Sequence, residues 1–136
     1  MKTAVLAFAL LPMCSPAPDV TDGYRHTDKA VMRLCPQWEP HARIAGWSQH
    51  DRVTLDRVIW NESRCQPWRI SPTNDYGLVQ INERTWSSLI ESHGDTIQDT
   101  LNPLINLVYA KLISNQARSY GWCRWQPWHG YSGDYC

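Results

Sequence analysis

The sequence lacks an excess of charge of either sign, because 13 Lys and Arg balance 13 Asp and Glu in 136 residues. Nucleic-acid binding usually requires a large basic surface, so this composition argues against a nucleic-acid partner. At this length the chain has room for one domain with a single modest core. A protein of two folded domains is therefore excluded.

The sequence also lacks a hydrophobic run long enough to span a bilayer, which takes about 20 residues. Its main apolar stretch covers residues 4–13 behind Lys2. That length is typical of the hydrophobic part of a signal peptide. We therefore expect a signal peptide or exported segment at 1–20, a polar linker at 21–33 and one folded domain at 34–136, with no stable membrane span.

No Cys-x-x-Cys pair is present, and the five histidines are scattered without ligand spacing. The sequence therefore predicts no metal site. Cys14 leaves lipidation of the exported segment open, although the residues before it depart from the usual lipobox. The remaining cysteines are an even number in a chain that we expect to be exported, and they predict two disulfides of open pairing among Cys35, Cys65, Cys123 and Cys136.

Three segments have the hydrophobic periodicity of helices. In the first, 54–63, Leu55, Val58 and Ile59 form an apolar face, and Glu62 follows at i+7 on the same face. Thr54 is the expected N-cap of this helix. A glutamate on the apolar face of a helix is the central observation of the sequence.

The second helix begins at Asn82 and ends at Gly94, with Trp86, Leu89 and Ile90 on one face. The third opens with Asn102-Pro103 and runs to Gly121. It is apolar nearly all round, as a central buried helix would be.

The segment between the first two helices, 64–81, is rich in turn-forming residues, including Asn74, Asp75 and Gly77. It ends in the alternating residues 78–81, which predict a small β-hairpin. Gly77 is expected to serve backbone geometry, because a turn before a hairpin often needs positive φ. The chain has no strands for a large sheet, so the expected class is mainly α with a minor β element.

Glu62 is a candidate proton donor, because burial disfavours the ionised form of a carboxyl and raises its pKa. Hydrolysis of a glycosidic bond needs such a donor, since the leaving sugar oxygen must be protonated as the bond breaks. The competing interpretation is that Glu62 only ends its helix, either exposed or paired with Arg64.

Several motifs in order resemble the superfamily of lytic transglycosylases and lysozymes. Glu62-Ser63 ends the first helix, Gly77-Leu78-Val79-Gln80 follows, and Asn106 stands inside the third helix. The resemblance covers roughly residues 34–128, and the joint pattern is specific where each motif alone is weak. In that family the first glutamate is the catalytic acid and the Gly-Leu-x-Gln segment lines the cleft, so the resemblance implies this role for Glu62.

The resemblance implies an α+β lysozyme-like fold, a helical domain with a small β-hairpin beside the active-site cleft. It implies cleavage of the β-1,4 bond between N-acetylmuramic acid and N-acetylglucosamine in peptidoglycan, by a lytic transglycosylase that forms 1,6-anhydro products. The expected partner is the glycan strand, no cofactor is needed, and we expect a monomer. Such a protein would be secreted, periplasmic or wall-associated in a bacterium, or act at the virion or host envelope if a bacteriophage encodes it.

Asp75 distinguishes two chemistries. Asp75-Tyr76-Gly77, with the Gln80-Ile81-Asn82 that follows, also resembles animal-type lysozymes, in which the aspartate stays ionised and assists cleavage. The interval between Glu62 and Asp75 is shorter here than in that group, so we expect Asp75 to matter less than Glu62. The alternatives are hydrolysis by both carboxylates, or an Asx-turn in which Asp75 binds nearby backbone amides.

The candidate substrate-binding residues are Ser63, Gln80, Asn82, Asn106 and Tyr109. The amide of Gln80 can donate and accept, which suits binding of an N-acetyl group or a hydroxyl. The alternatives are a solvated strand position for Gln80, a helix-end position for Ser63 and a helix-surface position for Asn106.

Eight tryptophans in so short a chain suit stacking on sugar rings, although core packing explains most of them. Trp122, Trp125 and Trp128 follow the third helix, where transglycosylases often carry an Ala-Tyr-Asn segment that this chain lacks, and we expect them to form the cleft wall. Two other functions stay open. One is a non-catalytic wall-binding or virion module, and the other is a secreted, disulfide-stapled interaction protein.

Overall fold

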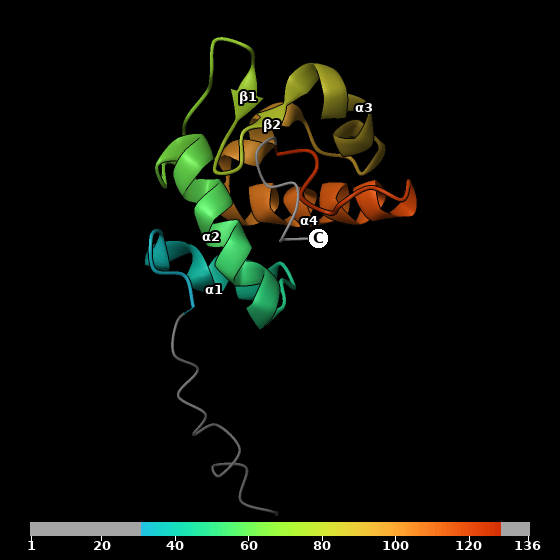
Figure 1. Ribbon diagram of the computed structural model, residues 1–136. Helices are drawn as coiled ribbons and strands as arrows, with labels where there is room; N and C mark the ends of the chain where they lie inside the picture. The colour runs from blue at the N-terminus through green and yellow to red at the C-terminus, as the bar shows by residue number, and fades with distance from the viewer. Residues whose placement is uncertain (1–30, 129–136) are drawn as a thin grey trace, which may run out of the picture.

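The computed structural model describes residues 31–128, so the predicted exported segment at 1–20 lies outside the described residues. Figure 1 shows α4 running across the molecule, with α2 crossing on one side, α1 beneath it and the two strands and α3 above. This is the mainly α fold with a small β element that the sequence predicts. The elements are η2 (Pro36–Trp38), α1 (Glu39–Ile44), α2 (Gln49–Ser63), β1 (Asp75–Tyr76), β2 (Ile81–Asn82), α3 (Glu83–Ser92), η3 (Ile97–Leu101) and α4 (Pro103–Ser119).

Helix α2 begins earlier than its periodicity indicates. Ser48 is its N-cap, with a side chain that accepts a hydrogen bond from the Asp51 N–H at 3.1 Å, whereas the predicted cap, Thr54, lies buried inside the helix. The predicted start was wrong because the first turn is polar and carries no periodic signal. The apolar face was predicted correctly, since its three aliphatic residues are fully buried.

Helices α3 and α4 begin at the predicted caps. The side chain of Asn82 accepts from the Thr85 N–H at 3.1 Å, and that of Asn102 accepts from the first turn of α4. Helix α4 packs centrally, but it is not buried all round as the sequence suggests, because Val108 is exposed on its outer side. A small single domain buries a smaller fraction of its surface than a large one, so the surrounding elements do not cover every side of the central helix.

The β-hairpin is shorter than its predicted pattern. Asp75 pairs with Asn82 and Tyr76 with Ile81, and residues 77–80 form the connection. Leu78 and Val79 are both fully buried, so the predicted alternation of residues 78–81 is wrong and the segment is a buried turn. Gly77 has a φ of 76°, as its predicted role in turn geometry requires.

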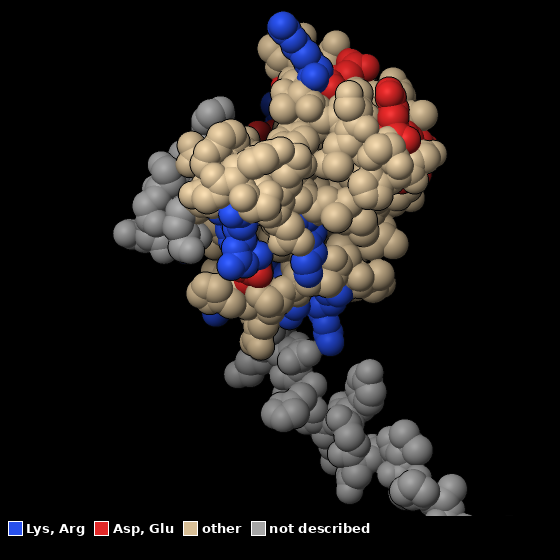
Figure 2. Space-filling model, turned by 90° about the vertical axis from the view of Figure 1, so that its right-hand side faces the viewer, with Lys and Arg blue, Asp and Glu red and all other residues tan. Residues whose placement is uncertain are grey.

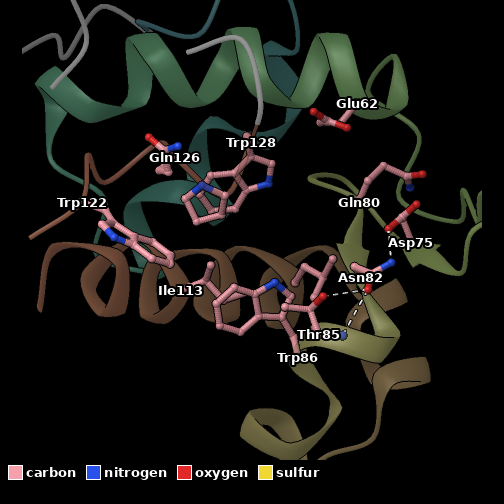
Figure 3. Close-up of a pocket in the computed structure, with 12 residues that line it drawn as sticks. Glu62, Asp75, Gln80, Asn82, Thr85, Trp86, Ile113, Trp122, Gln126 and Trp128 are labelled. Atoms are coloured by element: carbon pink, nitrogen blue, oxygen red, sulfur yellow. Dashed lines mark hydrogen bonds between the residues drawn. The ribbon is translucent and has the colours of Figure 1, made fainter. Parts of the chain in front are cut away.

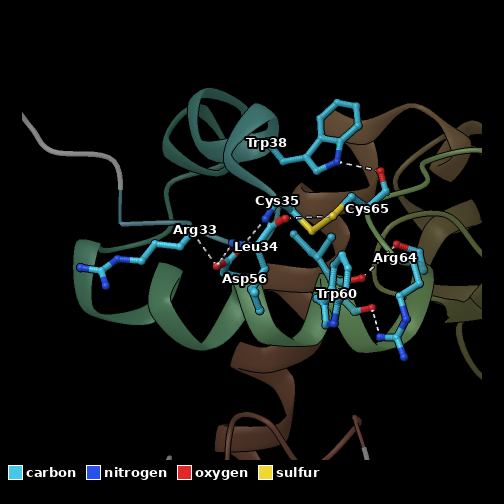
Figure 4. Close-up of a disulfide and its surroundings, with 10 residues drawn as sticks. Arg33, Leu34, Cys35, Trp38, Asp56, Trp60, Arg64 and Cys65 are labelled. Atoms are coloured by element: carbon cyan, nitrogen blue, oxygen red, sulfur yellow. Dashed lines mark hydrogen bonds between the residues drawn. A yellow bond between two sulfur atoms is a disulfide. The ribbon is translucent and has the colours of Figure 1, made fainter.

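The disulfide Cys35–Cys65 fastens the beginning of the described chain to the end of α2 (Figure 4). Next to it, the carboxylate of Asp56 accepts the backbone N–H groups of Arg33, Leu34 and Cys35 at 2.7–2.8 Å. Packing extends back to Met32, which is buried before the predicted domain start at residue 34. The chain that leads into the domain is therefore fixed on α2.

One of the two predicted disulfides is therefore confirmed. Cys123 is also disulfide-bonded, and Cys136 lies outside the described residues. The sequence left the pairing of the four cysteines open, and the fold decides it for Cys35 and Cys65.

Three tryptophan rings pack against one another in the core. Trp47 stacks on Trp125 with ring centroids 5.3 Å apart, and Trp125 contacts Trp128 at 5.9 Å. The indole N–H of Trp47 donates to the Leu107 carbonyl, and that of Trp128 donates to the Val79 carbonyl at 2.8 Å. Several of the tryptophans are thus core residues that join the segment after α4 to the rest of the fold.

The surface carries charges of both signs. On the face in Figure 2, acidic side chains gather toward the upper right and basic ones mostly in the lower half, with uncharged surface between them. Within residues 31–128, no helix has the length and apolarity needed to cross a membrane. The same part of the chain contains no group of three or more His, Cys, Asp or Glu side chains arranged to hold a metal ion.

Candidate active site

A cleft of about 760 Å³ is lined by residues from the end of α2, the hairpin, α3, α4 and the segment after α4 (Figure 3). Four of the predicted site residues lie on its wall: Glu62, Asp75, Gln80 and Asn82. Glu62 lies in the last turn of α2 and the other three belong to the β-hairpin, so only the tertiary structure brings them together. The two candidate carboxylates therefore share one cleft.

Helix α2 presents Glu62 at this cleft. The residue is half-buried in the last turn of the helix, whose apolar face is anchored in the core. Arg64, the alternative partner considered for Glu62, is directed elsewhere: its guanidinium lies over the Trp60 ring and donates to the Trp60 carbonyl (Figure 4). A carboxyl with this placement can reach the oxygen of a ligand bound in the cleft.

Asp75 is held by polar side chains of its own loop. One carboxylate oxygen accepts from the Ser71 and Thr73 hydroxyls at 2.5 Å, and the other accepts from the Asn82 amide at 2.7 Å. Burial raises the pKa of Asp75, but the three hydrogen bonds together lower it by more than burial raises it. The net pKa therefore lies below the ordinary value of an aspartate. Asp75 is therefore ionised in the folded protein at neutral pH.

These bonds differ from the Asx-turn considered for Asp75. The donors to its carboxylate are two hydroxyls and a side-chain amide rather than backbone amides, and the backbone N–H of Asp75 itself donates to the Ser71 hydroxyl. Ser71 and Thr73 were missed by the sequence reasoning. Hydroxyl residues in a turn carry no signal of their own until the hairpin brings them to the carboxylate.

Gln80 and Asn82 are fixed at the cleft by their amide groups. The Gln80 Nε2 donates to the Arg69 and Gly77 carbonyls at 3.1 and 2.9 Å, and the backbone of Gln80 has a φ of 52°. Asn82 acts in two directions, since its oxygen caps α3 while its nitrogen donates to Asp75. Both side chains are thus oriented before any ligand binds.

The other three predicted site residues lie in the core rather than on the cleft wall. Ser63 is fully buried, and its hydroxyl donates to the Ile59 carbonyl within α2. Asn106 is fully buried and ties α4 to the hairpin: it donates to the Tyr76 carbonyl and accepts from the Val79 N–H, both at 3.0 Å. These residues support the wall instead of forming it.

Tyr109 is likewise buried, and its hydroxyl donates to the Asp95 carboxylate at 2.6 Å. Burial, that hydrogen bond and the negative charges of Asp95 and Asp99 raise the pKa of Tyr109 to about 12. This tyrosine connects α4 to the end of α3.

Aromatic side chains complete the cleft. Trp86 of α3 lines it together with Trp122 and Trp128 from the segment after α4. The expectation of a tryptophan wall is confirmed for Trp122 and Trp128, whereas Trp125 is buried in the core. The sequence placed Trp86 on the apolar face of its helix but gave no sign that it reaches the cleft.

A small helical domain with a helix-end glutamate, a short hairpin and an aromatic-walled cleft defines the lysozyme-like α+β class. The family model of the transglycosylase SLT domain matches residues 42–133, and the chain belongs to this family. No curated protein and no solved structure matches the chain. Membership supports, at the level of the family, lytic transglycosylase activity on peptidoglycan.

Proposed function

We propose that this protein cleaves the β-1,4 bond between N-acetylmuramic acid and N-acetylglucosamine in peptidoglycan, with Glu62 as the catalytic acid. The observation that carries the proposal is the position of Glu62: it ends α2 on the wall of a cleft that also holds Gln80, in a chain of the SLT family. No cofactor takes part in this chemistry.

In the proposed reaction, Glu62 donates its proton to the glycosidic oxygen, and the bond from that oxygen to C1 of the muramoyl sugar breaks. Positive charge then develops at C1. The ionised Glu62 accepts the proton of the muramoyl 6-hydroxyl, whose oxygen bonds to C1 and closes a 1,6-anhydro ring. No water is consumed, which distinguishes a lytic transglycosylase from a hydrolase.

We expect the pKa of Glu62 to exceed that of an ordinary glutamate, because its helix face directs it toward apolar surroundings. The alkaline limb of the pH profile of kcat/KM reports this group in the free enzyme. A profile whose alkaline limb falls at the pKa of an exposed glutamate would contradict this assignment.

Of the predicted substrate-binding residues, Gln80 and Asn82 are proposed to face the glycan, because both line the cleft. Gln80 is suited to the N–H of an N-acetyl group or to a hydroxyl, since its amide oxygen can accept a hydrogen bond while its nitrogen donates to the Arg69 and Gly77 carbonyls. Ser63, Asn106 and Tyr109 are proposed to act indirectly, by holding α2, the hairpin and α3 in place.

Hydrolysis is the second candidate function, and Asp75 is the observation that favours it. This carboxylate lines the same cleft as Glu62 and has a lowered pKa. An ionised carboxylate can stabilise an oxocarbenium ion or attack C1, after which water releases a reducing sugar. The two candidates cut the same bond and differ in their product.

Mass spectrometry of the muropeptides released from purified peptidoglycan tests the proposal. Anhydro products, lighter by one water than reducing ones, identify a transglycosylase, and reducing products identify a hydrolase. A Glu62→Gln variant that loses cleavage but still sediments with peptidoglycan separates an enzyme from a wall-binding module. Wild-type protein that neither cuts nor sediments with peptidoglycan would favour an interaction protein instead.

Export of the protein belongs to this proposal, because its substrate lies outside the cytoplasm. Residues 4–13 have the composition of a signal peptide. Size-exclusion chromatography of the exported form tests the expected monomer.

A further inference from the structure

The segment after α4 is held to the rest of the fold at several points. Arg124 forms an ion pair with Asp51 in the first turn of α2. Trp125 is buried in the core, and the indole of Trp128 is hydrogen-bonded to the hairpin connection. This fixation means that the side chains it presents to the cleft stand in defined positions.

Trp122 is the member of this segment that packing does not explain. It lines the cleft and keeps 59% of its surface exposed. The ring of Tyr120 packs against it, with centroids 5.6 Å apart and planes tilted by 54°. A supported indole that stays exposed in a cleft offers a flat apolar face to a ligand.

Gln126 lines the same cleft and is exposed. Its amide can both donate and accept hydrogen bonds. An aromatic face and an amide that line one cleft match an N-acetylated sugar, whose ring has an apolar C–H face and whose acetamido group both donates and accepts. The pair therefore has the two chemical features that such a ligand requires.

The position of this pair is remote from the proposed catalytic acid. Asp51, which anchors Arg124, lies at the first turn of α2, and Glu62 lies at the last turn. At a rise of 1.5 Å per residue, the two ends are roughly 16 Å apart along the helix axis. Figure 3 shows Trp122 and Gln126 toward one end of the view and Glu62 toward the other.

We propose that Trp122 and Gln126 form a distal sugar-binding subsite, which takes an N-acetylated pyranose of a glycan chain whose scissile bond lies at Glu62. The inference rests on the proposed function. The subsite makes the protein selective for chains of several sugars, because only a long chain reaches both Glu62 and Trp122. A disaccharide bound at Glu62 does not use it.

The test measures binding in the full chain carrying Glu62→Gln, so that the sugar is not consumed. The probes are the hexamer and the dimer of β-1,4-linked N-acetylglucosamine, titrated by calorimetry. In the Glu62→Gln parent, the second substitution Trp122→Ala should weaken hexamer binding about tenfold, equivalent to about 1.4 kcal/mol. The reason is that the sugar ring can no longer bury its apolar face against the indole. Dimer binding should stay unchanged, and Trp122→Phe should retain most of the hexamer affinity.

Trp68→Ala is the matched control. Trp68 is a similarly exposed tryptophan, at 69%, that does not line the cleft. Its removal should leave both affinities unchanged. Both tryptophans are exposed, so both variants should keep the unfolding midpoint of the parent, which a thermal melt checks.

The possible outcomes separate the subsite from the proposed function. If the hexamer does not bind the parent, or binds the parent and Trp122→Ala equally, the subsite is refuted, whatever the wild type does to peptidoglycan. If Trp122→Ala alone weakens hexamer binding while the wild type releases no muropeptides, the subsite stands and the proposed cleavage is refuted.

Discussion

Replacing Asp75 by asparagine removes one negative charge at nearly constant size, and replacing Glu62 by glutamine does the same at the proposed acid. Both residues line the cleft, so a comparison of the two variants tells which carboxylates the reaction uses. We expect Asp75 to matter less, as the sequence interval and the Gly-Leu-x-Gln motif indicate. The wild type should then release mainly 1,6-anhydro products.

The expected magnitudes follow from the role of each group. General acid catalysis contributes about 10²–10⁴-fold, so Glu62→Gln should lower kcat by that range. Asp75→Asn should lower kcat by less than about tenfold in a one-carboxylate mechanism, because only nearby charge is lost. The assay is release of soluble muropeptides from purified peptidoglycan, with the product mass determined in the same sample.

The variant at Asp75 should also lose some stability, which must be separated from catalysis. Its two carboxylate oxygens accept hydrogen bonds from Ser71, Thr73 and Asn82, whereas an asparagine has one oxygen that can accept and a nitrogen that can only donate, so the variant loses part of these hydrogen bonds together with the charge. The site is half-exposed, so we expect a loss of about 1 kcal/mol in the free energy of unfolding. Kinetics at a temperature well below the melting midpoint remove this effect.

The pH dependence of that loss has a definite sign. The pKa of Asp75 is lowered in the folded state, so its ionised form stabilises the protein above the unfolded pKa of about 3.9. This contribution disappears as the pH falls through the lower, folded-state pKa. The difference in melting midpoint between wild type and Asp75→Asn should therefore be largest near neutral pH and shrink below about pH 4.

One result would refute the reasoning about Asp75. If Asp75→Asn and Glu62→Gln both lose activity by orders of magnitude while the wild type releases reducing ends, the enzyme is a hydrolytic lysozyme. In that case the short interval between the two residues still lets both carboxylates act on one sugar.

Three further predictions concern the scaffold. Breaking the Cys35–Cys65 disulfide by Cys35→Ser should cost about 3–4 kcal/mol in urea unfolding, because the bond closes a loop with a sequence separation of 30 residues, and an unchanged midpoint would contradict this. Gly77→Ala should destabilise by at least about 2 kcal/mol, since its φ is positive and its Cβ would lie 2.3 Å from the Asn106 amide; equal melting points would refute it. In ultraviolet titration, Tyr109→Phe should remove a component near pH 12 and leave lower-pH steps intact.

Local signals predicted the helices because each depends on neighbouring residues. The caps Asn82 and Asn102 and the positive φ of Gly77 follow from short-range chemistry, and the structure has all three. Helix α1 has six residues and contains Pro40, so it is too short for its periodicity to be detected. The first turn of α2 was missed because its residues are polar and add nothing to the hydrophobic periodicity.

The site was predictable in part. The motif order placed Glu62, Asp75, Gln80 and Asn82, and all four line one cleft. The motif order also indicated Asn106, which is buried and hydrogen-bonded to the hairpin. The type of a residue and its position in a motif do not determine whether its amide binds a ligand or forms hydrogen bonds with backbone groups of the protein.

The sequence by itself determined the helical class, the main caps, the turn glycine and the presence of a glutamate on an apolar helix face, because these depend on contacts within a few residues. Only the tertiary structure decided which polar groups meet. Asn106 binds Tyr76 across 30 residues, and Arg124 reaches Asp51 across 73. Contacts at such separations depend on how whole helices pack, and this packing also buries Trp125 while it leaves Trp122 exposed in the cleft.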